Sequence, residues 1–137
     1  MKAFSVERHG DDLVIAAAAY HRYDAFADAV GSVNVSRLLG VYRAMHGELE
    51  AAYRALGYPR IFFDKIALYL LRRIAGAPAP KGDVAVEQTN GMYVFKDARL
   101  EKLGAFEKHL IRMGPRNMRI IQNKAREILD QLSRESR

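Results

Sequence analysis

Three arginines gather where a helix is predicted to begin at Gly114-Pro115, and they are the residues best suited to bind a charged ligand. Proline is favoured at the first helical position. The start of a helix carries partial positive charge, so Arg112, Arg116 and Arg119 are locally unfavourable there by roughly a few tenths of a kcal/mol each. A phosphate, a carboxylate or an acidic partner would relieve that conflict. The competing interpretation is an ordinary solvated basic flank beside an apolar helix face.

Histidines and carboxylates could bind a metal ion if regular spacing brought them together. His46 and Glu50 are one helical turn apart, and His21 precedes Asp24 by three residues. We interpret both as solvated surface pairs. The chain has no cysteine, which removes disulfides, thiolate nucleophiles and Cys-ligated metals. We therefore predict no metal site and no cofactor.

Residues for nucleophilic or acid–base catalysis do not form a recognisable arrangement. The serines occupy hairpin, cap or tail positions, and the glycines fall singly at turns and helix ends, so neither a hydrolase elbow nor a phosphate loop is present. Asp11-Asp12 are adjacent in a polar turn, which does not suit acid–base catalysis. We do not expect an enzyme. Nucleic-acid binding is also disfavoured, because no aromatic residues interleave with the arginines.

Tyrosines are numerous, and four of them could form an aromatic ligand-binding cluster: Tyr20, Tyr23, Tyr58 and Tyr93. The competing interpretation is core packing with a hydrogen-bonded hydroxyl.

The elements that must position these residues follow from apolar periodicity and turn signals. The pattern predicts a mainly α fold, a bundle of about five helices with one or two short β-hairpins. The predicted helices cover residues 18–30, 34–57, a third ending at Gly76, 99–113 and 115–133. Hairpins are predicted around His9-Gly10-Asp11-Asp12 and around Asn90-Gly91, and a turn is predicted at Tyr58-Pro59. A long apolar stripe runs along the second helix. This helix and the third are therefore expected to form the antiparallel pair at the centre of the bundle.

Composition bounds the domain organisation. The chain has 137 residues, half of them apolar, and a net charge of +6. This is enough for one core without disulfides, so residues 1–137 are predicted to be a single soluble domain. The longest apolar candidate, Ile66 to Leu71, is far too short to cross a bilayer and is flanked by charges.

Several stretches together resemble a bacterial family of unknown function, found mainly in proteobacteria. They are Tyr20-His21-Arg22-Tyr23-Asp24, then residues 52–59, then Tyr93-Val94-Phe95 with Asp97 and Leu100-Glu101, and finally Lys108, Leu110, Arg112-Met113-Gly114-Pro115 and Asn117. The match covers nearly all of the chain. Two departures are Ala98, where a proline is common, and Arg116, where an acidic residue is common. The second departure argues against a cationic cluster as the site that members share. The polar residues that do match the family pattern are instead what the resemblance implies as a shared polar network or recognition patch: Arg22, Asp24, Arg112 and Asn117. The alternative for these four is helix capping and buried hydrogen bonding.

The resemblance implies no activity, but it implies a context. Members typically carry one N-terminal transmembrane helix and a proline-rich linker before this domain. We therefore expect either a trimmed form or a shortened member of the family. The full-length protein is expected to be anchored in the inner membrane with this domain in the periplasm, and to contact the membrane only through the anchor. The predicted function is a non-catalytic envelope domain acting in protein–protein interaction or assembly, with a protein partner in the envelope. The alternative is a binding module for an anionic small molecule or cell-envelope polymer at the cationic helix start.

Overall fold

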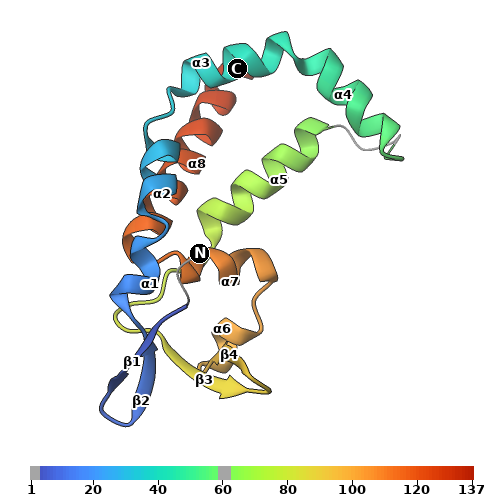
Figure 1. Cartoon of the computed structure of the whole chain (residues 1–137). Helices are drawn as coiled ribbons and strands as arrows, with labels where there is room; N and C mark the ends of the chain where they lie inside the picture. Colours follow the sequence, from blue (N-terminus) through green and yellow to red (C-terminus); the bar gives the residue numbers. More distant parts are fainter. Residues whose placement is uncertain (1–3, 59–62) are drawn as a thin grey trace.

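The computed structural model describes residues 4–58 and 63–137, and it is mainly helical with one small sheet (Figure 1). In chain order the helices are α1 (Ala17–His21), α2 (Asp24–Gly31), α3 (Val35–Ala44), α4 (His46–Ala55), α5 (Phe63–Gly76), α6 (Ala98–Glu101), α7 (Ala105–Arg112) and α8 (Pro115–Glu135). Within the described ranges, no helix combines the length and the apolar character that a bilayer crossing needs.

Two hairpins join edge to edge into one antiparallel sheet in the order β1-β2-β3-β4. The strands are β1 (Val6–His9), β2 (Asp12–Ile15), β3 (Ala85–Thr89) and β4 (Met92–Phe95). Asn90 and Gly91 both have positive φ (51° and 78°), as a two-residue turn between twisted strands requires. Both predicted hairpins are confirmed. Their union through the pairs Leu13↔Val86 and Val14↔Ala85 was not predicted.

The prediction of about five helices is corrected to eight in the described residues, because three predicted helices are interrupted. The first breaks at Arg22-Tyr23. The second breaks at Met45, where φ is −98° and ψ is 5°, values outside the helical region. The fourth breaks before Gly104, whose extended backbone starts α7. The predicted α5 and α8 are confirmed as continuous helices. The turn predicted at Tyr58-Pro59 includes Pro59, which lies outside the described residues.

The centre of the fold is α8, with α2 and α5 packed along it, rather than the predicted pair of second and third helices (Figure 1). Met118, Ile121 and Ala125 recur at helical spacing and are buried. Met118 and Ile121 complete a core with residues of β2, β3 and the loop after α5. The long apolar stripe of α3 and α4 was expected to supply this core. It buries few residues instead, which leaves part of that stripe at the surface.

Polar side chains of α8 also secure the carboxyl end of α5. Gln122 is buried, and its Nε2 lies 3.1 Å from the carbonyl oxygen of Ile74 and 2.9 Å from that of Ala77. Arg126 donates to the carbonyl of Ala75 at 3.0 Å. The last carbonyls of a helix have no partner within it, so these bonds satisfy the end of α5 and fix its angle to α8.

Candidate functional site

The predicted recognition residues meet where the α1–α2 turn lies against the start of α8. Gly114 makes this contact possible, since its φ is +96° and a Cβ there would lie 2.5 Å from Cγ of Tyr20. Only glycine combines that backbone with so close an approach. Segments nearly a hundred residues apart in the sequence are thereby held together.

Asn117 is the central residue of this junction and is only 1% exposed. Its Nδ2 lies 3.1 Å from the carbonyl oxygen of Tyr20, 2.9 Å from that of Met113 and 2.9 Å from Oδ1 of Asp24. Its Oδ1 accepts from Arg116 at 2.9 Å. The amide therefore bridges α1, α2, the end of α7 and α8 in one network. Both Asp24 and Asn117 were predicted as site residues, and the structure brings them into direct contact.

The charge of Arg116 is matched within the protein. Its guanidinium lies 2.6 Å from Oδ1 of Asp28 and 3.8 Å from Oδ1 of Asp24. Hydrogen bonds from His21 and then Asn117, with the nearby Arg116 charge adding to them, hold the pKa of Asp24 below its usual value. An acidic pair on α2 thus occupies the place that a bound anion would take.

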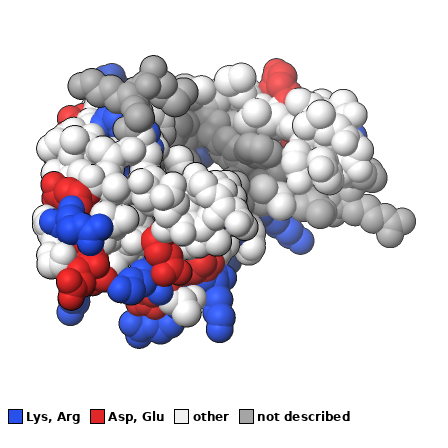
Figure 2. Space-filling view, turned by 60° about the horizontal axis from the view of Figure 1, so that its bottom comes forward, with Lys and Arg blue, Asp and Glu red and all other residues white. Residues whose placement is uncertain are grey.

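The other two arginines of the predicted cationic cluster have different surroundings. The guanidinium carbon of Arg112 lies 5.0 Å from the ring centroid of Phe95, a cation–π distance. Arg119 is exposed on α8. On the face drawn in Figure 2, acidic and basic side chains lie next to one another. The three arginines of the predicted cluster therefore have different surroundings: carboxylates for Arg116, an aromatic ring for Arg112 and solvent for Arg119.

Arg22 links two of the predicted tyrosines through ring contacts. Its guanidinium donates to the hydroxyl of Tyr23 at 2.9 Å and lies 5.9 Å from the ring centroid of Phe4. The Phe4 ring in turn lies 5.5 Å from that of Tyr93. This row connects α1 to the sheet.

Tyr58 does not join that row. It follows α4, at the far end of the molecule from α1 and the sheet, and stacks on Tyr53 with ring centroids 5.0 Å apart (Figure 1). The four tyrosines predicted as one cluster therefore occupy two separate places. Tyr20 packs against Gly114 and is half-buried, so burial raises the pKa of its hydroxyl.

A second polar group, formed by Glu101 and Lys108, lies beside the last strand of the sheet. Glu101 accepts from the backbone N–H of Phe95 at 2.9 Å and pairs with Lys108 at 3.0 Å. These two contacts, in that order, hold the pKa of Glu101 below its usual value. Each charge has a fixed partner, which is the arrangement of a structural clamp between β4, α6 and α7.

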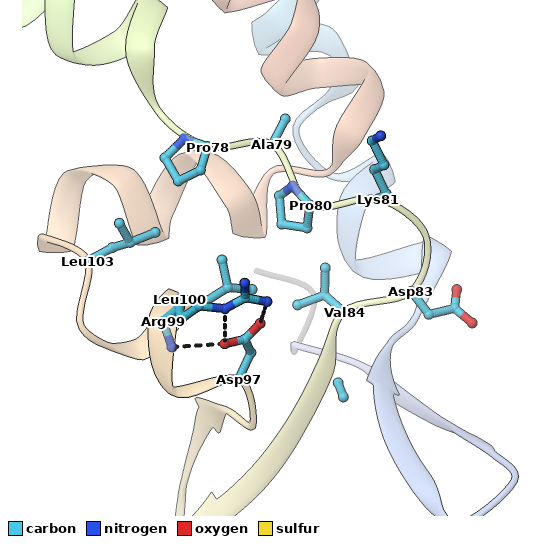
Figure 3. Close-up of a pocket in the computed structure, with 11 residues that line it drawn as sticks. Pro78, Ala79, Pro80, Lys81, Asp83, Val84, Asp97, Arg99, Leu100 and Leu103 are labelled. Atoms are coloured by element: carbon cyan, nitrogen blue, oxygen red, sulfur yellow. Dashed lines mark hydrogen bonds and ion pairs between the residues drawn. The ribbon is translucent and has the colours of Figure 1, made fainter.

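A shallow depression lies between the loop after α5 and α6, lined by Pro78, Pro80, Val84 and Leu100 among others (Figure 3). Its charged pair is Asp97 and Arg99. Asp97 caps α6 by accepting from the backbone N–H of Arg99 at 2.8 Å, and it also pairs with that residue's guanidinium. The carboxylate is thus engaged in holding a helix start.

The sequence missed a cluster on α4 and α5. His46 was interpreted as a surface partner of Glu50, but Glu50 is buried and Asp64 completes a group of three. Asp64 lies 18 residues after His46 and belongs to the next helix. Spacing within one helix does not relate residues of two different helices, so only the packing of α4 against α5 reveals the group.

The class of protein is a helical domain with a four-stranded sheet, held together by a polar and aromatic junction. Residues 1–129 match the family described as "Protein of unknown function (DUF3014)", and the chain belongs to that family. Searches of curated proteins and of solved structures gave no match. The motifs on which the resemblance rested are largely those that build the junction.

Proposed function

We propose that this is a protein-interaction domain that binds its partner through an exposed apolar stripe on α3. The stripe consists of Leu38, Val41 and Met45, which are 41%, 58% and 49% exposed. The core contacts of α3 are made by Val35 and Leu39. Leu38, Val41 and Met45 fall on the neighbouring flank at helical spacing, so the stripe is continuous. This exposed stripe is the observation on which the proposal rests.

An apolar stripe exposed to water is less favourable in free energy than the same stripe buried against a partner. Burying apolar area contributes about 25 cal/mol per Å², and contiguous apolar patches on a soluble domain mark interaction surfaces. Further large apolar side chains are exposed near the end of α4, where Leu56 is 73% exposed. The α3–α4 arm arches away from the sheet and α7, which leaves it accessible (Figure 1).

The charges of α3 suggest the chemistry of the partner. This helix carries Arg37 and Arg43 and no acidic residue. Arg43 pairs with Glu135 of α8. Arg37 is exposed one turn before Val41, so it borders the stripe. The partner surface that fits is an amphipathic segment with an apolar face and carboxylates along its edge.

The setting of this interaction is proposed from the family resemblance. Members typically carry an N-terminal transmembrane helix and a proline-rich linker, which supports a periplasmic domain on an inner-membrane anchor and a partner in the cell envelope. Fractionation of cells that make the native protein tests this setting. We expect the protein in the inner-membrane fraction, and we expect added protease to cleave its domain only after the outer membrane is permeabilised. If the protein is recovered as a soluble cytoplasmic protein, the proposed setting is refuted, but the proposed role of the stripe is not.

Site-specific photocrosslinking tests the stripe directly. A benzoylphenylalanine at Met45 should give an adduct of defined mass in cells, whereas the same group at Gln88, exposed on β3, should not. Val41→Glu and Arg37→Glu should each weaken the adduct, the first through the apolar contact and the second through charge. An adduct at twice the mass of the chain would identify a second copy as the partner. Absence of any adduct at Met45, or equal adducts at both positions, would refute the proposal.

A further inference from the structure

We propose that His46, Glu50 and Asp64 form a binding site for a divalent transition-metal ion of the zinc or manganese type. Imidazole nitrogen and carboxylate oxygen are the donors that such ions prefer. This inference goes beyond the interaction stripe, because the metal can bind whether or not a partner does.

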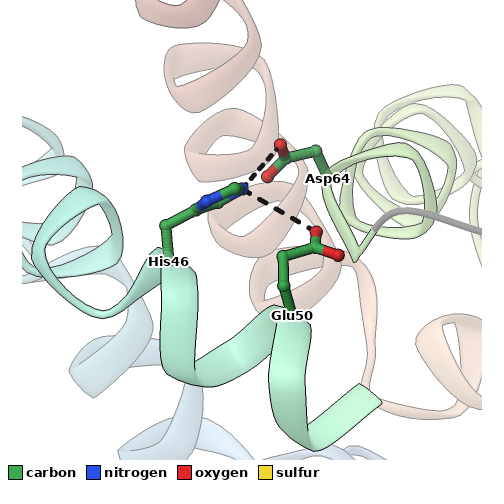
Figure 4. A group of neighbouring side chains, drawn as sticks. All are labelled: His46, Glu50 and Asp64. Atoms are coloured by element: carbon green, nitrogen blue, oxygen red, sulfur yellow. Dashed lines mark hydrogen bonds and ion pairs between the residues drawn. The ribbon is translucent and has the colours of Figure 1, made fainter. Parts of the chain in front are cut away.

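The donor atoms already converge. Nε2 of His46 lies 3.0 Å from Oδ2 of Asp64 and 3.7 Å from Oε1 of Glu50. One donor atom from each residue lies within 4.8 Å of the other two. In a tetrahedral zinc site with bonds of 2.0–2.2 Å, neighbouring donors are separated by about 3.3–3.6 Å. Small side-chain rotations therefore suffice for coordination, and Figure 4 shows the three side chains directed toward one point.

The backbone presents these donors from two rigid elements. His46 and Glu50 stand at i and i+4 in α4, so they share one helix face, and Asp64 is the second residue of α5. Sites whose ligands come from helices are held more precisely than sites on loops. A bound ion would join α4 to α5 across the segment that connects them.

A hydrogen bond also orients one of the proposed ligands. The hydroxyl of Tyr42 donates to Oδ1 of Asp64, which leaves Oδ2 directed at His46. The Tyr42 ring meets the imidazole edge-on, with centroids 5.9 Å apart and planes at 76°. Outer partners of this kind fix ligand orientation and raise metal affinity. Glu50 is the most buried of the three proposed ligands, with its side chain 12% exposed, whereas the side chains of His46 and Asp64 are 44% and 48% exposed and leave an ion access from solvent.

Titration calorimetry on tag-free protein stripped with a chelator tests the site. We expect about one Zn²⁺ or Mn²⁺ per chain, with Mg²⁺ binding far more weakly because imidazole is a poor ligand for it. Co²⁺ should give visible absorption bands that Zn²⁺ displaces. His46→Ala and Asp64→Asn should each weaken binding by about tenfold or more, a loss of the size that disturbed metal sites show.

The matched control is His21→Ala, which removes an imidazole hydrogen-bonded at 2.9 Å to a single carboxylate. This variant should bind the metal as the wild type does. Asp64→Asn keeps the side-chain shape, and circular dichroism should show unchanged helicity, which separates lost ligation from lost folding. Absence of stoichiometric binding, or equal affinity in the His46→Ala and His21→Ala variants, would overturn the proposal. Crosslinking at Met45 with and without chelator separates the two proposals. An adduct that persists after the metal is removed supports the interaction stripe independently of the metal site.

Discussion

Replacing Asn117 by alanine should destabilise the domain strongly, because its amide is buried and bridges four elements. The two bonds to the carbonyls of Tyr20 and Met113 contribute about 1 kcal/mol each, and leaving the Met113 carbonyl without this donor costs about 1 kcal/mol more. The expected loss is therefore about 3 kcal/mol in the free energy of unfolding. That is a large share of the total for a domain of this size.

Thermal and urea unfolding followed by circular dichroism measure this loss. At the usual unfolding entropy per residue, about 3 kcal/mol corresponds to a fall of about 10 °C in Tm for a chain of this length. The matched control is Asn123→Ala, on the exposed side of the same helix, where Asn123 accepts a single hydrogen bond among the described residues, from Arg126. That variant should stay within about 0.5 kcal/mol of wild type.

The comparison of the two variants decides whether the junction is structural. If Asn117→Ala unfolds at the same temperature as Asn123→Ala, the bridging amide does not hold α1, α2 and α8 together. The account of the junction as a stabilising network would then be wrong, and its residues would be available for a role in binding.

Two further predictions concern the backbone at Gly114 and the acid stability of the fold. Gly114→Ala should lower the free energy of unfolding by about 1–3 kcal/mol, because φ is +96° and the new Cβ would clash with Tyr20. The control Gly40→Ala, in α3 with open space around it, should raise that free energy by about 0.5–1 kcal/mol. Equal Tm shifts in the two variants would contradict this prediction. The bidentate pair with Arg73 lowers the pKa of Glu107, so its contribution to stability is complete above the ordinary carboxyl pKa and is lost as the pH falls through the lower folded value. Unfolding midpoints measured from pH 7 to 3 should fall less steeply for Glu107→Gln than for wild type.

Parts of this fold could be predicted from local signals. Asn90-Gly91 marks a turn wherever it stands between apolar runs, and Gly114-Pro115 marks the start of α8. Two polar residues of the junction, Asp24 and Asn117, could also be named in advance, but through the family resemblance and not through a local signal. Their role as hydrogen-bond partners was one of the two interpretations left open.

Other parts depend on packing that no local pattern encodes. The helix break at Met45 occurs in a sequence without proline and with continuous apolar spacing, so the stripe of α3 and α4 was assigned to the core. The core formed around α8 instead, because Met118 and Ile121 join a cluster that includes residues of both α2 and the sheet. Asp64 lies beside His46 because α4 packs against α5, which is again a contact between elements. Contacts between elements decide these outcomes, and the period of a single helix does not contain them.

The edge-to-edge pairing of the two hairpins has a consequence for the order of folding. Each hairpin closes over a few residues and can form within microseconds, but β2 and β3 are separated in the chain by α1 to α5. Their pairing, including the bond from Ile15 N–H to the Val84 carbonyl, must await closure of that long loop and should therefore be a late step.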